Sequence, residues 1–223
     1  MRRRRGCIVL LAVGGLLLAG AVYVSENLQK VDISRGFGRA AWQLPEQTVE
    51  ALALQPGDQV ADIGAGDGYF TFFLADAVGV SGEVFAVEID EDLVTRLKRK
   101  AKERDYLNVT GVRGQVDDPL LADGEIDLVF ISNTYHHLQN REAYFTRLRT
   151  DLERGGRVAI VDWKPIPLVK LFVPSGHWIN VDSVLVEMDS AGFVMDKSHD
   201  FLPFHHFLIF RVKSSIDKIL PSG

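Results

Sequence analysis

The chain has 223 residues, of which 47% are hydrophobic and 25% charged, so it is long enough to bury one sizeable core and too apolar to be disordered. Its single cysteine, Cys7, excludes a disulfide framework and a cysteine-rich zinc or iron–sulfur site. Without the run Arg2–Arg5, 21 basic residues stand against 30 acidic ones, and a body this acidic is not expected to bind nucleic acid.

The N-terminus differs in character from the rest of the chain. No charged side chain occurs in residues 6–24, and this apolar run follows four arginines. At about 1.5 Å per residue, a helix of about 19 residues just spans a bilayer core of roughly 30 Å. The sequence therefore predicts one hydrophobic helix that enters a lipid bilayer. It divides the chain into an anchor and linker, residues 1–29, and a folded domain, residues 30–223.

Two other interpretations of residues 6–24 stay open. A basic start, an apolar core and the small residues Ala19 and Ala21 also fit a secretory signal that is cleaved near Ala21. The same segment could instead pack as a hydrophobic helix against the domain. The three interpretations differ in whether the segment ends in the bilayer, is removed, or joins the core.

The body alternates β-type and helical patterns, which indicates a parallel sheet covered by helices on both faces. Residues 126–132 form a nearly continuous apolar run, typical of a strand buried on both sides. Gly155 and Gly156 are expected to mark the exit from a helix. In chain order the patterns predict a helix over 45–54, a strand over 59–63, a helix over 69–78, a strand over 83–89, a helix over 92–104, strands over 108–113 and 126–132, a helix over 141–152, a strand over 157–163, a helix over 181–191, and a final hairpin of 193–201 and 206–212.

A glycine-rich turn follows the first predicted strand. Gly64, Gly66 and Gly68 stand where that strand gives way to a helix, so the backbone can approach a ligand without a Cβ in the way. The dinucleotide-binding fingerprint would need a further glycine where this chain has Tyr69. Glu88, at the tip of the next strand, can accept hydrogen bonds from two adjacent ribose hydroxyls.

Together with Asp62 ahead of the turn, these residues resemble the first two motifs of the class I S-adenosylmethionine-dependent methyltransferases. The resemblance covers about residues 40 to 212. It implies a Rossmann-like, doubly wound, seven-stranded and mostly parallel sheet that ends in an antiparallel hairpin. It also implies S-adenosyl-L-methionine as cofactor. In this family the turn, here Gly64, Ala65, Gly66 and Gly68, passes beneath the methionine and ribose, Glu88 holds the ribose hydroxyls, and Asp62 orders the loop or faces the methionine amino group.

The contact with the adenine ring matches the family less well. Many relatives carry an aspartate there, and when the motif is matched to this chain ahead of the fourth predicted strand, Gln115 takes its place. Asp117 lies two residues further on and is our candidate for this contact from a rearranged loop. The alternative is that Asp117 belongs only to an acidic turn before Pro119.

The segment Asn133–His137 follows the fourth predicted strand and should lie beside the glycine turn. We expect Asn133 to contact the cofactor. We expect His137, and after it His136, to take a proton from a small methyl acceptor, which the membrane segment suggests is lipophilic. Alternatively, these histidines cap the following helix or bind backbone within the fold. Asp162, at the tip of the next strand, either lines the acceptor pocket or caps a turn.

The remaining histidines do not predict a metal site. His177, His199, His205 and His206 have no cysteine beside them, and the last two should point to opposite sides of a strand. The sequence therefore predicts a methyltransferase without a metal. A membrane-anchored module that binds S-adenosylmethionine without turnover is the alternative.

Two observations disagree on the side of the membrane on which the folded domain lies. The arginine cluster should stay in the cytoplasm and would send the domain to the other side. The cofactor, however, is made and regenerated in the cytosol, and we give this more weight. We therefore expect a single-pass membrane protein with a cytoplasmic domain, with export after cleavage near Ala21 as the alternative.

Overall fold

The computed structural model describes residues 38–214 and 217. The predicted membrane segment of residues 6–24, the cleavage site near Ala21 and the boundary between residues 29 and 30 lie outside these residues. Across the described ranges we find no helix that combines the length and the hydropathy needed to cross a bilayer.

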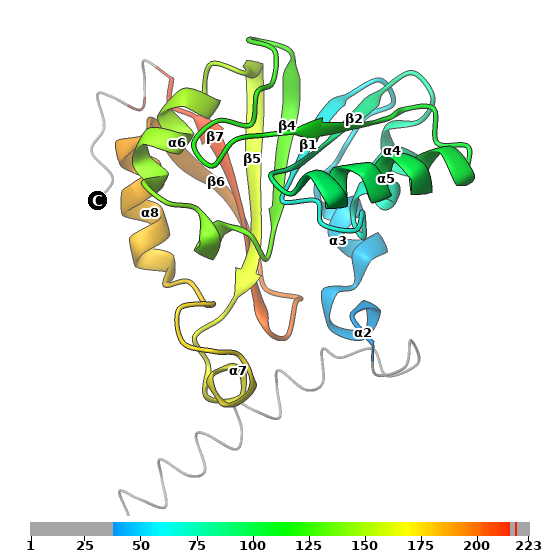
Figure 1. Ribbon diagram of the computed structural model, residues 1–223. Coiled ribbons are helices and arrows are strands. Elements are labelled where there is room, and N and C mark those ends of the chain that lie inside the picture. Colours follow the sequence, from blue (N-terminus) through cyan, green and yellow to red (C-terminus); the bar gives the residue numbers. More distant parts are fainter. Residues whose placement is uncertain (1–37, 215–216, 218–223) are drawn as a thin grey trace, which may run out of the picture.

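A seven-stranded sheet forms the centre of the domain, in the order β3-β2-β1-β4-β5-β7-β6 (Figure 1). Strand β7 runs antiparallel to both of its neighbours, whereas the pairs from β3 to β5 are parallel. This confirms the predicted fold class, including the terminal hairpin. The strands are β1 (Gln59–Ile63), β2 (Glu83–Glu88), β3 (Val109–Arg113), β4 (Ile126–Ser132), β5 (Leu152–Trp163), β6 (Phe193–His199) and β7 (His205–Val212).

Helices cover both faces of the sheet (Figure 1). Apolar residues of α3 and α4 pack on one face, and those of α6 and α8 pack on the other. Helix α5 lies against β2 and β3 on the α4 side, where Leu97 meets Ala86. The helices are α2 (Ala40–Gln43), α3 (Pro45–Ala51), α4 (Thr71–Val78), α5 (Glu91–Glu103), the 3-10 helix η2 (Tyr135–His137), α6 (Arg141–Leu148), α7 (Pro167–Phe172) and α8 (Val181–Ser190).

Strand β4 lies at the middle of the core. Its residues Leu128, Val129, Phe130 and Ile131 are all fully buried, and alternate ones contribute to the apolar clusters on opposite faces. The continuous apolar run in the sequence has this cause, because a central parallel strand has no solvent-facing side. The carboxyl ends of β4 and β5 are therefore rigid supports for the segments that follow them.

The prediction that Gly155 and Gly156 mark a helix exit is wrong. Helix α6 ends at Leu148, and both glycines lie inside β5, which begins at Leu152. A Cβ on Gly156 would lie 2.8 Å from the carbonyl oxygen of Ile126. The glycine therefore lets β5 approach β4 closely where their register is irregular.

Two short helices lie outside the sequence prediction. Helix α2 precedes α3, and α7 occupies the proline-containing crossing after β5. Both lie at the end of the domain where β4 and β5 finish (Figure 1). They border the region in which parallel α/β sheets bind their ligands.

Candidate active site

The glycine turn passes against the segment that follows β4. The backbone N–H groups of Gly64 and Ala65 donate to the carbonyl oxygen of Val87, at 2.9 and 3.1 Å. Gly64 has a φ of +71°, and a Cβ there would lie 2.3 Å from Oγ1 of Thr134. Only glycine therefore fits at this position, which brings bare backbone to the carboxyl edge of the sheet.

Glu88 ends β2 with its carboxylate directed at this turn. One carboxylate oxygen accepts from the backbone N–H of Gly66 at 3.1 Å, and the other accepts from that of Ile89 at 2.8 Å. The donors belong to the loops on both sides of the site. Glu88 is thus a charged acceptor held at the strand tip where the sequence predicts contact with ribose hydroxyls.

Asp62 is buried beneath the turn. Its carboxylate accepts a hydrogen bond from the hydroxyl of Thr71 at 2.7 Å, which ties the end of β1 to the start of α4. Burial raises the pKa of Asp62 from 3.8 to about 6, although the Thr71 hydroxyl and the charge of Arg39 act in the opposite direction. This geometry matches the loop-ordering role predicted for Asp62.

A cleft of about 360 Å³ opens between these elements. This volume lies in the usual range for small-molecule sites, about 300 to 1,000 Å³. Residues from the tips of β1, β2 and β4 and from the loops after β3 and η2 contribute to its wall. The lining residues are Ile63, Gly64, Val87, Glu88, Ile89, Gln115, Val116, Thr134, His137, Leu138 and Tyr144.

His136 lies next to this cleft and is held by a buried carboxylate. Its Nδ1 lies 2.8 and 3.0 Å from the two carboxylate oxygens of Asp162, and its backbone N–H donates to one of them. The side chain of His136 is 5% exposed and that of Asp162 is not exposed at all. Asp162 therefore orients the ring of His136, and this contact links the tips of β4 and β5.

Comparisons with known proteins agree with this architecture. The family described as "Methyltransferase domain" matches residues 60–156. The arsenite methyltransferase of Halobacterium salinarum is 28% identical over 49% of this chain and 28% of its own length. The demethylmenaquinone methyltransferase of Anoxybacillus flavithermus is 25% identical over 62% of this chain and 58% of its own length. The chain thus spans well under two thirds of the length of these curated relatives.

A solved structure shares most of this fold. An S-adenosylmethionine-dependent methyltransferase from Aquifex aeolicus superimposes with a TM-score of 0.73 at 22% identity, over 81% of this chain and 97% of that protein. Residues 60–156 therefore resemble a class I S-adenosylmethionine-dependent methyltransferase domain, and the chain shares its fold. The predicted cofactor, S-adenosylmethionine, is the methyl donor of such a domain.

The site has features that fit this cofactor. Gly64 brings bare backbone to the wall of the cleft, and Glu88 offers charged acceptor oxygens beside it. The side-chain oxygen of Asn133 is buried and has no hydrogen-bond partner within the described chain. Asn133 adopts a φ of +53°, and its N–H donates to Val161. An unsatisfied buried acceptor suits a ligand that carries an ammonium group and a sulfonium charge, because both are cationic.

The other predicted cofactor residues support the turn from within. Ala65 is buried against Ala86 and Leu97, and a Cβ on Gly68 would lie 2.9 Å from the ring of Phe72. The N–H of Gly66 is used by Glu88. These residues shape the turn, whereas Gly64 and Glu88 line the cleft itself.

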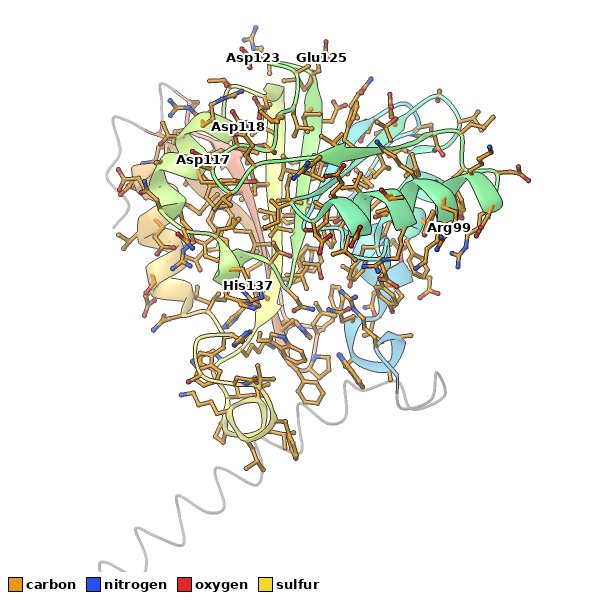
Figure 2. All side chains as sticks on the ribbon, viewed as in Figure 1. Arg99, Asp117, Asp118, Asp123, Glu125 and His137 are labelled. Atoms are coloured by element: carbon orange, nitrogen blue, oxygen red, sulfur yellow. The ribbon has the colours of Figure 1, made fainter. Side chains whose placement is uncertain are left out.

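Asp117 lies apart from the site it was predicted to join. Among the described residues, Gln115 and Val116 line the cleft and Asp117 does not. Figure 2 places Asp117 toward the end of the domain that carries Asp118 and Asp123, away from His137. The chain turns tightly after Val116, since the backbone N–H of Gln115 donates to the carbonyl oxygen of Asp118 at 2.7 Å. The residue that faces the cleft is therefore Gln115, which the match to the family motif had put at this position.

His137 lines the cleft and His136 lies beside it, so the structure brings both predicted histidines to the site. Their ring centroids are 4.1 Å apart. Partial burial and the nearby rings of His136 and His177 lower the pKa of His137, against the opposing effect of Asp162. The lowered pKa favours the neutral form of the His137 ring.

His177 joins this pair, although the sequence did not single it out as a site residue. It lies between α7 and α8, and its ring centroid is 5.1 Å from that of His136 and 5.2 Å from that of His137. Residues 136 and 177 are far apart in the chain, so no local pattern could have linked them. Only the return of the chain from α7 past the tip of β5 brings them together.

Proposed function

We propose that this protein transfers a methyl group from S-adenosylmethionine to a small, lipophilic acceptor at the carboxyl ends of β4 and β5. The observation that carries the proposal is the position of the two histidines at the wall of the cleft. His137 lines the cleft, and the adjoining His136 is oriented by Asp162. An acceptor beside the cofactor would therefore meet imidazole groups that can accept a proton.

A second cleft supports the lipophilic character of the acceptor. It has a volume of about 240 Å³ and is walled almost entirely by apolar groups at the same end of the domain. Trp163, the residue after Asp162, contributes to it at the end of β5. An apolar portion of an acceptor could occupy this cleft with little loss of hydration. The lining residues are Trp42, Trp163, Leu168, Val169, Phe172, Val173 and Phe204.

The relative named demethylmenaquinone methyltransferase supports a small-molecule acceptor. Transfer from a sulfonium needs an aligned acceptor and exclusion of water, and an acceptor hydroxyl must also lose its proton. The bound cofactor supplies the methyl group. The residues of this chain hold the ligands together and place His136 and His137 at the acceptor.

The direct test is turnover. Purified full-length protein is incubated with radiolabelled S-adenosylmethionine and an organic-solvent extract of cells, and label is counted in the organic phase. We expect labelled product that depends on the extract. His137→Ala should lower the rate by about 10²- to 10⁴-fold while cofactor affinity is nearly kept, because a general base typically contributes that factor. Cofactor binding without transfer to any fraction would instead support the non-catalytic binding module.

We also propose that residues 6–24 hold the domain on a bilayer. Their uncharged sequence behind Arg2–Arg5 supports this, and so does the surface of α7, where the side chains of Leu171 and Phe172 are 73% and 76% exposed. Helix α7 lies at the same end of the domain as α2, the first described helix (Figure 1). A bilayer at this end would face the apolar cleft. Release of the full-length protein by alkaline carbonate would contradict the anchor.

The cytoplasmic side remains our proposal for the domain, because the cofactor is supplied there. Protease added to sealed, right-side-out vesicles should leave the domain intact. Digestion of the domain in those vesicles would place it on the outer side.

A further inference from the structure

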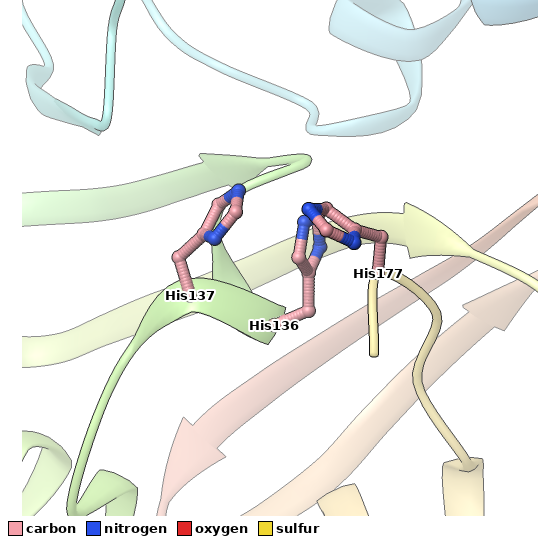
Figure 3. Close-up of side chains that lie close together, drawn as sticks. All are labelled: His136, His137 and His177. Carbon is pink, nitrogen blue, oxygen red and sulfur yellow. The ribbon is translucent and has the colours of Figure 1, made fainter. Parts of the chain in front are cut away.

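Three histidines from two distant segments meet beside the cofactor cleft. His136 and His137 belong to η2, and His177 comes from the loop between α7 and α8. One ring nitrogen of each lies within 4.8 Å of the others. Figure 3 shows the rings of His136 and His177 next to each other, with His137 turned toward them. Three imidazoles this close are a potential ligand set for a transition metal ion.

The contact between His136 and Asp162 is a second and independent observation. Metal-binding histidines almost always direct their other ring nitrogen to a carboxylate or a carbonyl group, which fixes the tautomer. Here Nδ1 lies 2.8 Å from a carboxylate oxygen of the fully buried Asp162. In the tautomer that donates this hydrogen bond the proton is on Nδ1, which leaves the lone pair of Nε2 available for an ion.

His177 supplies a third observation. Its Nδ1 is buried and has no hydrogen-bond partner in the described part of the chain. The neighbouring backbone is fixed, because the N–H of Ile179 donates to the carbonyl oxygen of Trp163 at the end of β5. The ring is thus held near η2 by the fold, while one of its polar atoms lacks a partner. Buried polar atoms without a partner are uncommon and often mark a site for a ligand or an ion.

We propose that His136, His137 and His177 bind one divalent transition metal ion of the zinc type. Imidazole nitrogens suit Zn²⁺ and its neighbours, whereas a site for Mg²⁺ or Ca²⁺ would need oxygen ligands. In a tetrahedral site with bonds of about 2.0 to 2.1 Å, the nitrogens would be about 3.3 Å apart. The three candidate ligand atoms lie within 4.8 Å of one another, so they would have to move closer together when the ion binds.

Three protein ligands leave one position of a tetrahedral ion open, as catalytic zinc sites do. Because His137 lines the cofactor cleft, that position would face the space where an acceptor lies. The ion would take a water molecule or a donor oxygen of the acceptor there. This last step rests on the proposed function, whereas binding of the ion does not. A loaded site uses the imidazole lone pairs, so the histidines would then act as ligands rather than as a general base.

The test reads metal binding directly. Untagged full-length protein is stripped with a chelator and titrated with Co²⁺, whose visible absorption reports coordination by imidazole, and then with Zn²⁺ in competition. We expect saturation at one ion per chain and displacement of Co²⁺ by Zn²⁺. His177→Gln and His137→Gln should each weaken binding by at least about tenfold, and Asp162→Asn by about 10- to 100-fold, the usual effect of losing the carboxylate partner of a ligand. His199→Gln, outside the cluster, should bind as the wild type does.

Binding by His177→Gln and His137→Gln that equals the wild type would overturn the proposal, as would the absence of saturable binding to the wild type. Thermal melting of each variant checks that it folds, and the exposed ring of His137 makes His137→Gln the variant least able to disturb the core. The result is separate from turnover. An inactive protein that binds one ion through these residues would refute the proposed function and leave the metal site intact.

Discussion

Replacing Asp62 with asparagine should stabilise the protein at neutral pH. The carboxyl group is 3% exposed, and burial raises its pKa from 3.8 to about 6. The native state therefore keeps the proton at a pH where the unfolded chain has already lost it. An asparagine has nearly the same shape, can still accept the hydrogen bond from Thr71, and never carries the charge.

The sign and size follow from proton linkage. Between pH 3.8 and about 6 the unfolded state binds fewer protons than the native state, so the wild type loses stability as pH rises through this window. A shift of about 2.2 units is worth about 3 kcal/mol, at about 1.4 kcal/mol per unit. The variant should therefore be more stable by about 3 kcal/mol at about pH 7.5, and by less than about 1 kcal/mol near pH 4.

Urea denaturation of the wild type and of Asp62→Asn across this pH range measures the difference in their free energies of unfolding. All other titrating groups are the same in the two proteins, so their contributions cancel. Asp67→Asn is the matched control, because Asp67 lies in the same turn with a side chain that is 67% exposed and pairs with Lys100. An exposed pair contributes only about 0 to 1 kcal/mol, so no comparable gain is expected there. If Asp62→Asn is less stable than the wild type at neutral pH, the buried charge of Asp62 does not destabilise the native state and this reasoning is wrong.

Three positions give two further predictions of stability. In urea denaturation, Gly64→Ala should lower the free energy of unfolding by about 1 to 3 kcal/mol more than Gly66→Ala does. Both glycines have positive φ, but only a Cβ at position 64 would collide with Thr134. Equal losses would mean that the turn can move away from Thr134. His205 is fully buried, which lowers its pKa from 6.5 to about 3, so the unfolded state gains a proton first as pH falls below 6.5. Stability should drop by about 2 to 3 kcal/mol between about pH 7.5 and pH 4.5, and His205→Gln should remove most of that drop in the same assay; an unchanged slope would refute the assignment.

The sheet and the glycine turn were predictable because their signals are local. Strand β1 has the predicted bounds, 59–63, since a short apolar run ends there in glycines that must adopt positive φ. The apolar run of β4 likewise reflects burial on both faces. Gly156 misled the prediction because a glycine can serve either a helix end or a close approach of two strands, and the sequence does not distinguish them.

The acceptor side was predictable only in part, because it depends on distant contacts. The pairing of His136 with Asp162 joins residues from two neighbouring strand tips, and the sequence did not connect them. His177 reaches the same place only through the path of α7 and the loop after it. The position of Asp117 depends on how the loop after β3 turns, and the composition of that loop does not fix its direction.

The central claim is that the cleft beside Gly64 and Glu88 binds S-adenosylmethionine, and calorimetric titration with S-adenosylhomocysteine tests it most directly. The wild type should bind one molecule per chain. Glu88→Ala should lose at least about tenfold in affinity, because each charge-assisted hydrogen bond contributes about 1.5 to 3 kcal/mol. Glu91→Ala is the control, since Glu91 is exposed nearby and pairs with Arg113. An unchanged affinity in Glu88→Ala, or no binding by the wild type, would contradict the claim.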